Sequence, residues 1–170
     1  MTTRPSFLGI PVSGDIPGDK PTPQRPLEDL RPILQALLDD PAVHSFGWHQ
    51  FTPFYNDGEP CRFTINRFWV RTQTDPLRSD VDDLEVFGAD GHPTLGQRIN
   101  VYGKNADGAH TRIGTSFRGP DEAAYDRAAA ATAVECGTFD AVLLEAFGDS
   151  TAVSVHKDHV DLQLYRPVPF

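Results

Sequence analysis

The residues with the clearest chemical potential lie in one short stretch of the chain, between Trp48 and Cys61. His49 precedes a turn that carries Asp57 and Glu59, and Cys61 follows that turn. A histidine close to a cysteine can hold the sulfur as a thiolate and so create a nucleophile. The two carboxylates oppose this, because nearby negative charge raises the pKa of a thiol. An enzyme or small-ligand site made of Cys61, His49, Asp57 and Glu59 is therefore one hypothesis among three.

The same stretch also has the composition of a binding surface. Asn56, Asp57 and Gly58 are typical of a tight turn, and aromatic residues precede them. Rigid aromatic rings beside a polar turn make good anchors at protein interfaces. We therefore expect a recognition surface made of seven residues: Trp48, Gln50, Phe54, Tyr55, Asn56, Asp57 and Glu59. The pattern leaves open whether the rings fill the interior instead.

A weaker signal for metal binding lies near the end of the chain. His156 and His159 flank a predicted turn, and Asp158 or Asp161 could add an oxygen ligand. The local sequence supplies no third firm ligand, so we predict no metal site here. The chain lacks a phosphate-binding loop and a Gly-x-Ser-x-Gly elbow, and we expect no cofactor.

Two blocks of sequence resemble a known group of proteins. Residues 48–61, Trp-His-Gln-Phe-Thr-Pro-Phe-Tyr-Asn-Asp-Gly-Glu-Pro-Cys, resemble a block in an uncharacterised group of small bacterial and phage proteins. Phe147-Gly148-Asp149, followed by a valine-rich hairpin, is similar to the end of the same group. The resemblance implies a bacterial or phage origin and carries no established activity.

Residues 27–40 have the spacing of an amphipathic helix, with apolar side chains at every third or fourth position. Glu28 and Asp29 suit the positive end of the helix dipole, and Pro41 closes the segment.

Residues 121–147 have the same spacing over a longer run. Asp121 can cap the first free amides, Gly137 is a candidate kink and Gly148 ends the segment. Cys136 falls on the apolar stripe, so we expect it to be buried.

Three antiparallel hairpins are predicted from alternating patterns and turn residues. They pair residues 43–54 with 61–71, 98–103 with 111–117, and 151–155 with 160–165. In the first, the apolar positions change parity after Asn66, so either a bulge lies near Asn66 and Arg67 or both faces of the strand are covered there. In the third, a two-residue turn at Lys157 and Asp158 would place Val155 opposite Val160. Residues 75–96 read as a long loop with one short element at 81–87.

The expected fold class is α+β, with the hairpins forming one or two sheets and the two helices packed on a face. Residues 1–26 are rich in proline and glycine and are predicted to be a flexible or docking arm, and residues 27–170 a single domain. The arm has apolar candidate anchors at Phe7, Leu8, Ile10 and Val12.

Composition limits the partners. The chain has 24 acidic and 15 basic residues and a net charge of -9, which disfavours generic nucleic-acid binding. No apolar run reaches the ~20 residues of a membrane helix, and no signal pattern opens the chain. We therefore expect no membrane association, a cytoplasmic location in a bacterium or a phage-infected cell, and two reduced cysteines.

These observations favour a non-catalytic module that binds a protein partner or associates with itself. The thiol site described above is the first alternative. A virion structural or assembly protein whose N-terminal arm clasps a neighbour is the second.

Overall fold

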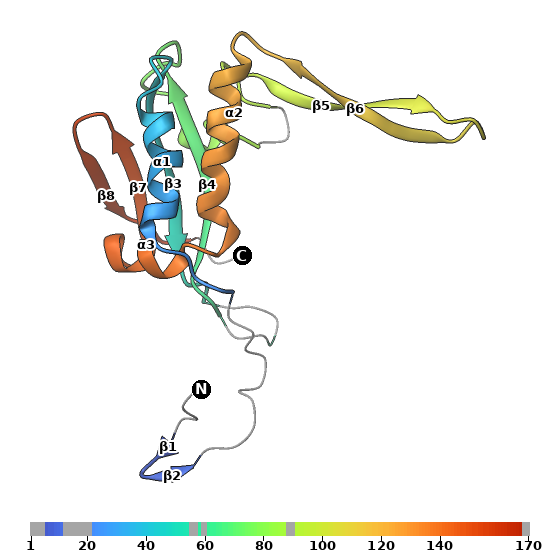
Figure 1. Cartoon of the computed structure of the whole chain (residues 1–170). Helices are drawn as coiled ribbons and strands as arrows, with labels where there is room; N and C mark the ends of the chain where they lie inside the picture. Colours follow the sequence, from blue (N-terminus) through green and yellow to red (C-terminus); the bar gives the residue numbers. More distant parts are fainter. Residues whose placement is uncertain (1–5, 12–21, 55–57, 59–60, 88–90, 168–170) are drawn as a thin grey trace.

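A four-stranded antiparallel sheet with helices on one face forms the body of the protein (Figure 1). The computed structural model describes residues 6–11, 22–54, 58, 61–87 and 91–167. The sheet has the order β4-β3-β7-β8, built from β3 (Val43–Phe51), β4 (Thr64–Thr72), β7 (Thr151–His156) and β8 (Val160–Leu164). The helices are α1 (Leu27–Leu38), α2 (Glu122–Ala131) and α3 (Asp140–Phe147).

Two smaller strand pairs complete the described β structure. The strands β5 (Gln97–Lys104) and β6 (His110–Arg118) form a two-stranded ribbon, and β1 (Ser6–Phe7) pairs with β2 (Ile10–Pro11). Two 3-10 turns, η1 (Val81–Leu84) and η2 (Thr132–Cys136), lie between the larger elements. The α+β prediction is confirmed.

The first hairpin carries the predicted bulge. The pairing of β3 with β4 shifts between Gly47 and His49, which face Trp69 and Asn66. The extra residue therefore falls on β4, and Arg67 there has a φ of 56°. This left-handed residue reverses the parity of the strand, which is the change seen in the sequence.

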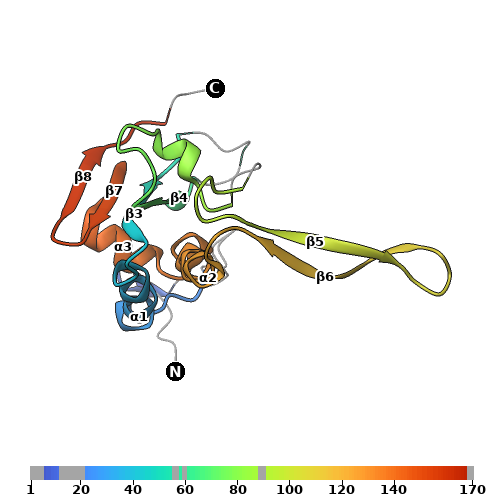
Figure 2. The same ribbon diagram turned by 90° about the horizontal axis from the view of Figure 1, so that it is seen from above.

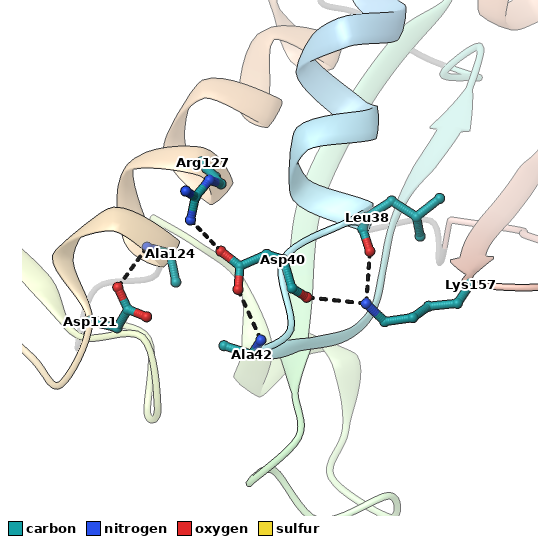
Figure 3. Close-up of polar contacts among 7 residues, drawn as sticks. All are labelled: Leu38, Asp40, Ala42, Asp121, Ala124, Arg127 and Lys157. Atoms are coloured by element: carbon teal, nitrogen blue, oxygen red, sulfur yellow. Dashed lines mark hydrogen bonds and ion pairs between the residues drawn. The ribbon is translucent and has the colours of Figure 1, made fainter.

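The third hairpin has the predicted register. Val155 faces Val160, and the amide of His156 donates to the carbonyl of His159 at 2.8 Å, so Lys157 and Asp158 form the two-residue turn. Lys157 also fixes this turn to the body, because its Nζ donates to the carbonyls of Leu38 and Asp40 at 2.8 and 3.1 Å (Figure 3).

Asp40 joins the same turn region to α2. Its buried carboxylate accepts a hydrogen bond from the amide of Ala42 at 2.9 Å and pairs with Arg127 of α2 at 2.6 Å (Figure 3). The C-terminal end of α1, the side of α2 and the tip of the β7–β8 hairpin are thus held together through one carboxylate and one lysine.

The predicted helix at 121–147 is broken rather than kinked. Asp121 caps α2 by accepting from the amide of Ala124 at 3.0 Å, and Gly148 follows the last residue of α3, as predicted. Between them Gly137 has a φ of 80°, a conformation that ends η2 and turns the chain into α3. Cys136 is exposed, so the prediction that it is buried is wrong, because the break takes its side chain off the apolar stripe.

Residues 22–26, which the sequence placed in the arm, contact this break. Gln24 accepts a hydrogen bond from the amide of Ala141 at 2.9 Å and donates to the carbonyl of Gly137 at 2.8 Å. Gln24 therefore satisfies an amide in the first turn of α3 that lacks a partner within the helix. In the described part of the arm, Leu8 and Ile10 are exposed, while the side chains of Phe7 and Val12 lie outside the described residues.

The segment between β4 and β5 is well packed although it has little regular structure. The predicted short element is present as η1, and Leu84 and Leu95 are buried. His92 is also buried: its Nε2 lies 2.6 Å from the carbonyl of Val70, and its Nδ1 accepts from the amide of Leu95 at 3.0 Å. Burial lowers the pKa of His92, against smaller raising effects of the Val70 carbonyl and a nearby carboxylate.

None of the helices in the described ranges is both long and apolar enough to cross a lipid bilayer.

Candidate functional site

Most of the predicted aromatic recognition surface lies inside the protein. Trp48 is 1% exposed and packs edge-on against Phe147, with ring centroids 5.9 Å apart. Gln50 is 0% exposed. Both side chains point from β3 toward the helices. The prediction that Trp48 and Gln50 belong to a contact surface is therefore wrong. The sequence missed this because it did not show that both faces of β3 are covered.

Gln50 instead connects β3 to α3. Its Oε1 accepts from the indole Nε1 of Trp48 at 3.0 Å, and its Nε2 donates to the carbonyls of Leu143 and Gly148 at 3.1 and 2.5 Å. The side-chain amide thus satisfies a buried indole and two carbonyls near the C-terminal end of α3.

Phe54 is the one described aromatic of the predicted surface that is exposed, at 81%. Tyr55, Asn56, Asp57 and Glu59 lie outside the described residues. A surface around this turn therefore stays a prediction that now depends on Phe54 alone.

The proposed thiol site is not assembled in the described part of the chain. His49 pairs across the hairpin with Asn66, five positions from the exposed Cys61. The His49 ring stacks on Tyr165 with centroids 4.1 Å apart, and its Nδ1 has no hydrogen-bond partner among the described residues. Burial lowers the pKa of His49, so the neutral ring is favoured. A neutral, packed histidine does not activate a distant thiol.

The open edge of the sheet presents a surface that the sequence did not identify. On β8, the outermost strand, Val160, Leu162 and Leu164 are 45%, 51% and 71% exposed (Figure 1). Their partners on β7 are Val155, Val153 and Thr151, so the three side chains lie on the face of the sheet that the helices cover farther in. The helices do not extend over this edge, and a stripe of aliphatic side chains remains in contact with solvent. We call these three residues the β8 stripe.

The residues of the β8 stripe are also the ones whose backbone N–H and C=O groups point outward from the sheet. The amide of His156 donates to the carbonyl of His159, and the amide of Tyr165 donates to the carbonyl of Ser150 at 2.7 Å. Both bonds join an odd-numbered residue of the second strand to β7, so the odd-numbered residues of β8 are the ones whose peptide groups bond to β7. In an antiparallel pair, alternate residues turn their peptide groups away from the partner. The peptide groups of the β8 stripe therefore face the open edge.

The opposite edge of the sheet is closed. Trp69 of β4 forms an isolated bridge with Glu85, and the amide of Val86 donates to the carbonyl of Phe68 at 3.1 Å. The segment that follows η1 therefore occupies the outer side of β4 at Phe68 and Trp69, and a further strand cannot pair with the middle of β4.

The β5–β6 ribbon projects from the body (Figures 1 and 2). At its base, Arg98 pairs with Glu122 and Asp126 of α2 at 2.8 and 2.6 Å, and Phe117 contacts the ring of Tyr125. Farther out, every described residue of β6 before Phe117 is exposed.

The two faces of the ribbon differ. Tyr102 pairs with Arg112 and Lys104 with His110, which places a basic face on one side. Ile99 and Val101 lie on the other side, and Ile113 joins them because its side chain lies over Gly103. Residues 97–118 contain four arginines or lysines and one aspartate, so the ribbon is basic although the chain is acidic.

His156, His159 and Asp161 gather at the tip of the β7–β8 hairpin, so Asp161 is the one of the two carboxylates offered by the sequence that joins both histidines. Nε2 of His156 and Nε2 of His159 lie 3.5 and 3.4 Å from the same oxygen of Asp161. Asp158 holds Nδ1 of His159 at 2.6 Å. This hydrogen bond is the main cause of a raised pKa of His159 and a lowered pKa of Asp158.

No protein-family model matches this sequence, and neither the curated proteins nor the solved structures contain a significant match.

Proposed function

We propose that this protein is a non-catalytic assembly module that joins a second copy of itself through β8, with the two sheets continuing across a two-fold axis. One observation carries the proposal: the residues of β8 whose peptide groups face outward are the same residues whose aliphatic side chains are uncovered. An exposed edge strand with apolar side chains is a template for pairing with another strand. Natural monomers usually block such an edge with charge, proline or a covering segment, as this chain does at β4.

The sequence of β8 is self-complementary in one register. An antiparallel pair centred on Leu162 places Leu162 opposite its own copy and Val160 opposite Leu164. On the other face the same register places Asp161 opposite Gln163 and not opposite a second Asp161. Like charges directly opposite one another are destabilising, so this register avoids repulsion while it aligns the stripe. A surface that complements itself about a two-fold axis is what a closed dimer needs.

The expected strength is that of a reversible dimer. Each side chain of the β8 stripe is about half exposed, so covering it contributes ~1 kcal/mol, or ~6 kcal/mol for both copies. Six new backbone hydrogen bonds add a similar amount at ~1 kcal/mol each. The loss of translational and rotational freedom opposes this by ~4 kcal/mol or more. We therefore expect a dissociation constant on the order of micromolar.

The ribbon favours the same class of function. Its apolar face, with Ile99, Val101 and Ile113, lies on an arm that projects from the body and is tied to α2 at its base. Such an arm is suited to packing on a neighbouring subunit. The proposed setting, the cytoplasm of a bacterium or of a phage-infected cell, rests on the resemblance of residues 48–61.

Sedimentation velocity over a range of protein concentrations tests the β8 pairing. Leu162→Lys removes the central leucine of both copies and places two ammonium groups opposite each other, so the dimer should weaken about 100-fold. Gln163→Lys is the matched control, because it adds the same charge one residue away on the opposite face, where it would meet Asp161 of the other copy. This control should dimerise at least as well as the unchanged protein.

Amide hydrogen exchange gives a second readout. Amides of residues 161 and 163 should be protected at every concentration, because they bond to β7. Amides of the β8 stripe should gain protection only as the dimer forms. A protein that stays monomeric at several hundred times the expected micromolar constant, or a dimer that Leu162→Lys leaves intact, would overturn the proposal; the second result would direct attention to the ribbon.

A further inference from the structure

The hairpin tip between β7 and β8 carries three side chains that can ligate a metal ion. One ligand atom each from His156, His159 and Asp161 lies within 4.8 Å of the other two. Imidazole nitrogen with one carboxylate oxygen is a donor set that suits Zn²⁺ and similar divalent transition-metal ions. It does not suit Mg²⁺ or Ca²⁺, which take six or more oxygen ligands.

The spacing agrees with tetrahedral coordination. Bonds of ~2.0–2.2 Å from zinc to nitrogen or oxygen separate two ligands of a tetrahedron by ~3.4 Å. The distances from the shared Asp161 oxygen to the two histidine Nε2 atoms are 3.5 and 3.4 Å. The ligand atoms of the two histidines lie within 4.8 Å of each other. The rings are stacked with centroids 4.4 Å apart, and a tilt of the exposed His159 ring brings its Nε2 toward the shared centre.

Asp158 prepares His159 for this role. Its carboxylate lies 2.6 Å from Nδ1 of His159, so Nδ1 carries a hydrogen and Nε2 is the nitrogen left to ligate. Histidine ligands usually donate their second ring N–H to a carboxylate or a carbonyl, which sets the tautomer and orients the ring.

The backbone beneath the cluster is held in place. The two-residue turn is closed by the hydrogen bond between His156 and His159, and Lys157 is anchored to the carbonyls that follow α1 (Figure 3). Asp161 is paired with Ser154 in the β ladder. Because the ligands stand on a fixed hairpin, little backbone conformational freedom is lost when an ion binds.

We propose that His156, His159 and Asp161 form a binding site for one divalent transition-metal ion of the zinc type. The three residues supply three ligands, Asp158 positions His159, and the fourth coordination position faces solvent. All three ligands come from one chain, so the site does not depend on pairing through β8.

Calorimetric titration with Zn²⁺, at pH 7.5 on tag-free protein dialysed against chelator, tests the site. We expect one ion per chain, with binding weakened at least 10-fold in each of His156→Ala, His159→Ala and Asp161→Asn. Asp158→Asn should weaken binding about 10-fold without changing the stoichiometry. His110→Ala is the matched control: it removes an exposed histidine on the ribbon and should bind like the unchanged protein.

Co²⁺ reports the geometry in the same set of variants. A three-ligand site with one solvent ligand should give the intense visible absorption of tetrahedral Co²⁺, and His159→Ala should abolish it. The Leu162→Lys variant should bind both ions with unchanged affinity, so this result is independent of the dimer. The proposal fails if no ion binds at millimolar concentration, if His159→Ala binds like the unchanged protein, or if His110→Ala loses binding.

Discussion

Replacing Gln50 with leucine tests whether this residue is part of the structure, as its hydrogen bonds indicate, or is free to act at a surface. Leucine has a similar volume, so the substitution removes hydrogen bonds without opening a large cavity. The indole N–H of Trp48 and the carbonyl of Leu143 then lose their partner in the interior. The carbonyl of Gly148 lies at an exposed residue, and water can replace the lost bond there.

The expected loss follows from the two groups left buried without a partner. An unsatisfied buried donor or acceptor costs ~1–3 kcal/mol, and the relief from burying an amide offsets part of this. We expect Gln50→Leu to lower the free energy of unfolding by ~3 kcal/mol. For a chain of this size, that loss lowers the melting temperature by ~6–12 °C.

Urea unfolding, followed by tryptophan fluorescence and by circular dichroism in the Leu162→Lys background, measures this loss without a contribution from association. Gln35→Leu is the control, because Gln35 is exposed on α1 and its side-chain amide donates to the exposed carboxylate of the neighbouring Asp39. It should change the free energy of unfolding by less than ~0.5 kcal/mol. If Gln50→Leu also falls within ~1 kcal/mol of the unchanged protein, the structural role assigned to Gln50 is refuted.

Two further predictions concern the interior. Burial lowers the pKa of His92 in the folded protein, so as the pH drops the unfolded chain binds a proton at a higher pH than the folded one does. The contribution of neutral His92 to the free energy of unfolding should be fully present above pH ~6.5 and should be lost as the pH drops through the folded pKa. Urea unfolding at pH 7 and pH 5 should show this loss, and His92→Gln should reduce the slope; an unchanged slope would contradict the assignment. Gly47→Ala should destabilise the fold by several kcal/mol, about 3 or more, because a Cβ there would lie 2.0 Å from the carbonyl oxygen of Val153. Gly114→Ala on the ribbon meets nothing within 4 Å and should leave the melting temperature unchanged, so equal effects of the two substitutions would refute the packing described for Gly47.

Short-range patterns predicted the elements well. The turn at Lys157 and Asp158, the register of Val155 with Val160 and the bulge at Arg67 were all readable, because side-chain alternation and turn chemistry act over a few residues. At Gly137 the sequence predicted a kink, whereas the structure has a break between two helices. A glycine in a helical pattern is compatible with either a kink or a stop, and only the contacts of Gln24 and Phe139 in the fold decide between them.

The candidate sites were harder to predict than the elements. Trp48 and Gln50 looked like surface anchors, and both are interior, because β3 is an inner strand of the main sheet, between β4 and β7, and is covered on both faces. Conversely, Val160, Leu162 and Leu164 were not singled out in the sequence, and they are exposed because the helices stop short of the last strand.

The sequence alone determined the helix at 27–40, the three larger hairpins and their turns, and which side chains share a face of each hairpin. Tertiary structure alone decided the order β4-β3-β7-β8, and with it which strand is central and which is an open edge. The physical reason is that burial depends on neighbours far apart in the chain, whereas alternation and turn chemistry depend on neighbours only a few residues away. The same strand order that covers Trp48 leaves β8 uncovered.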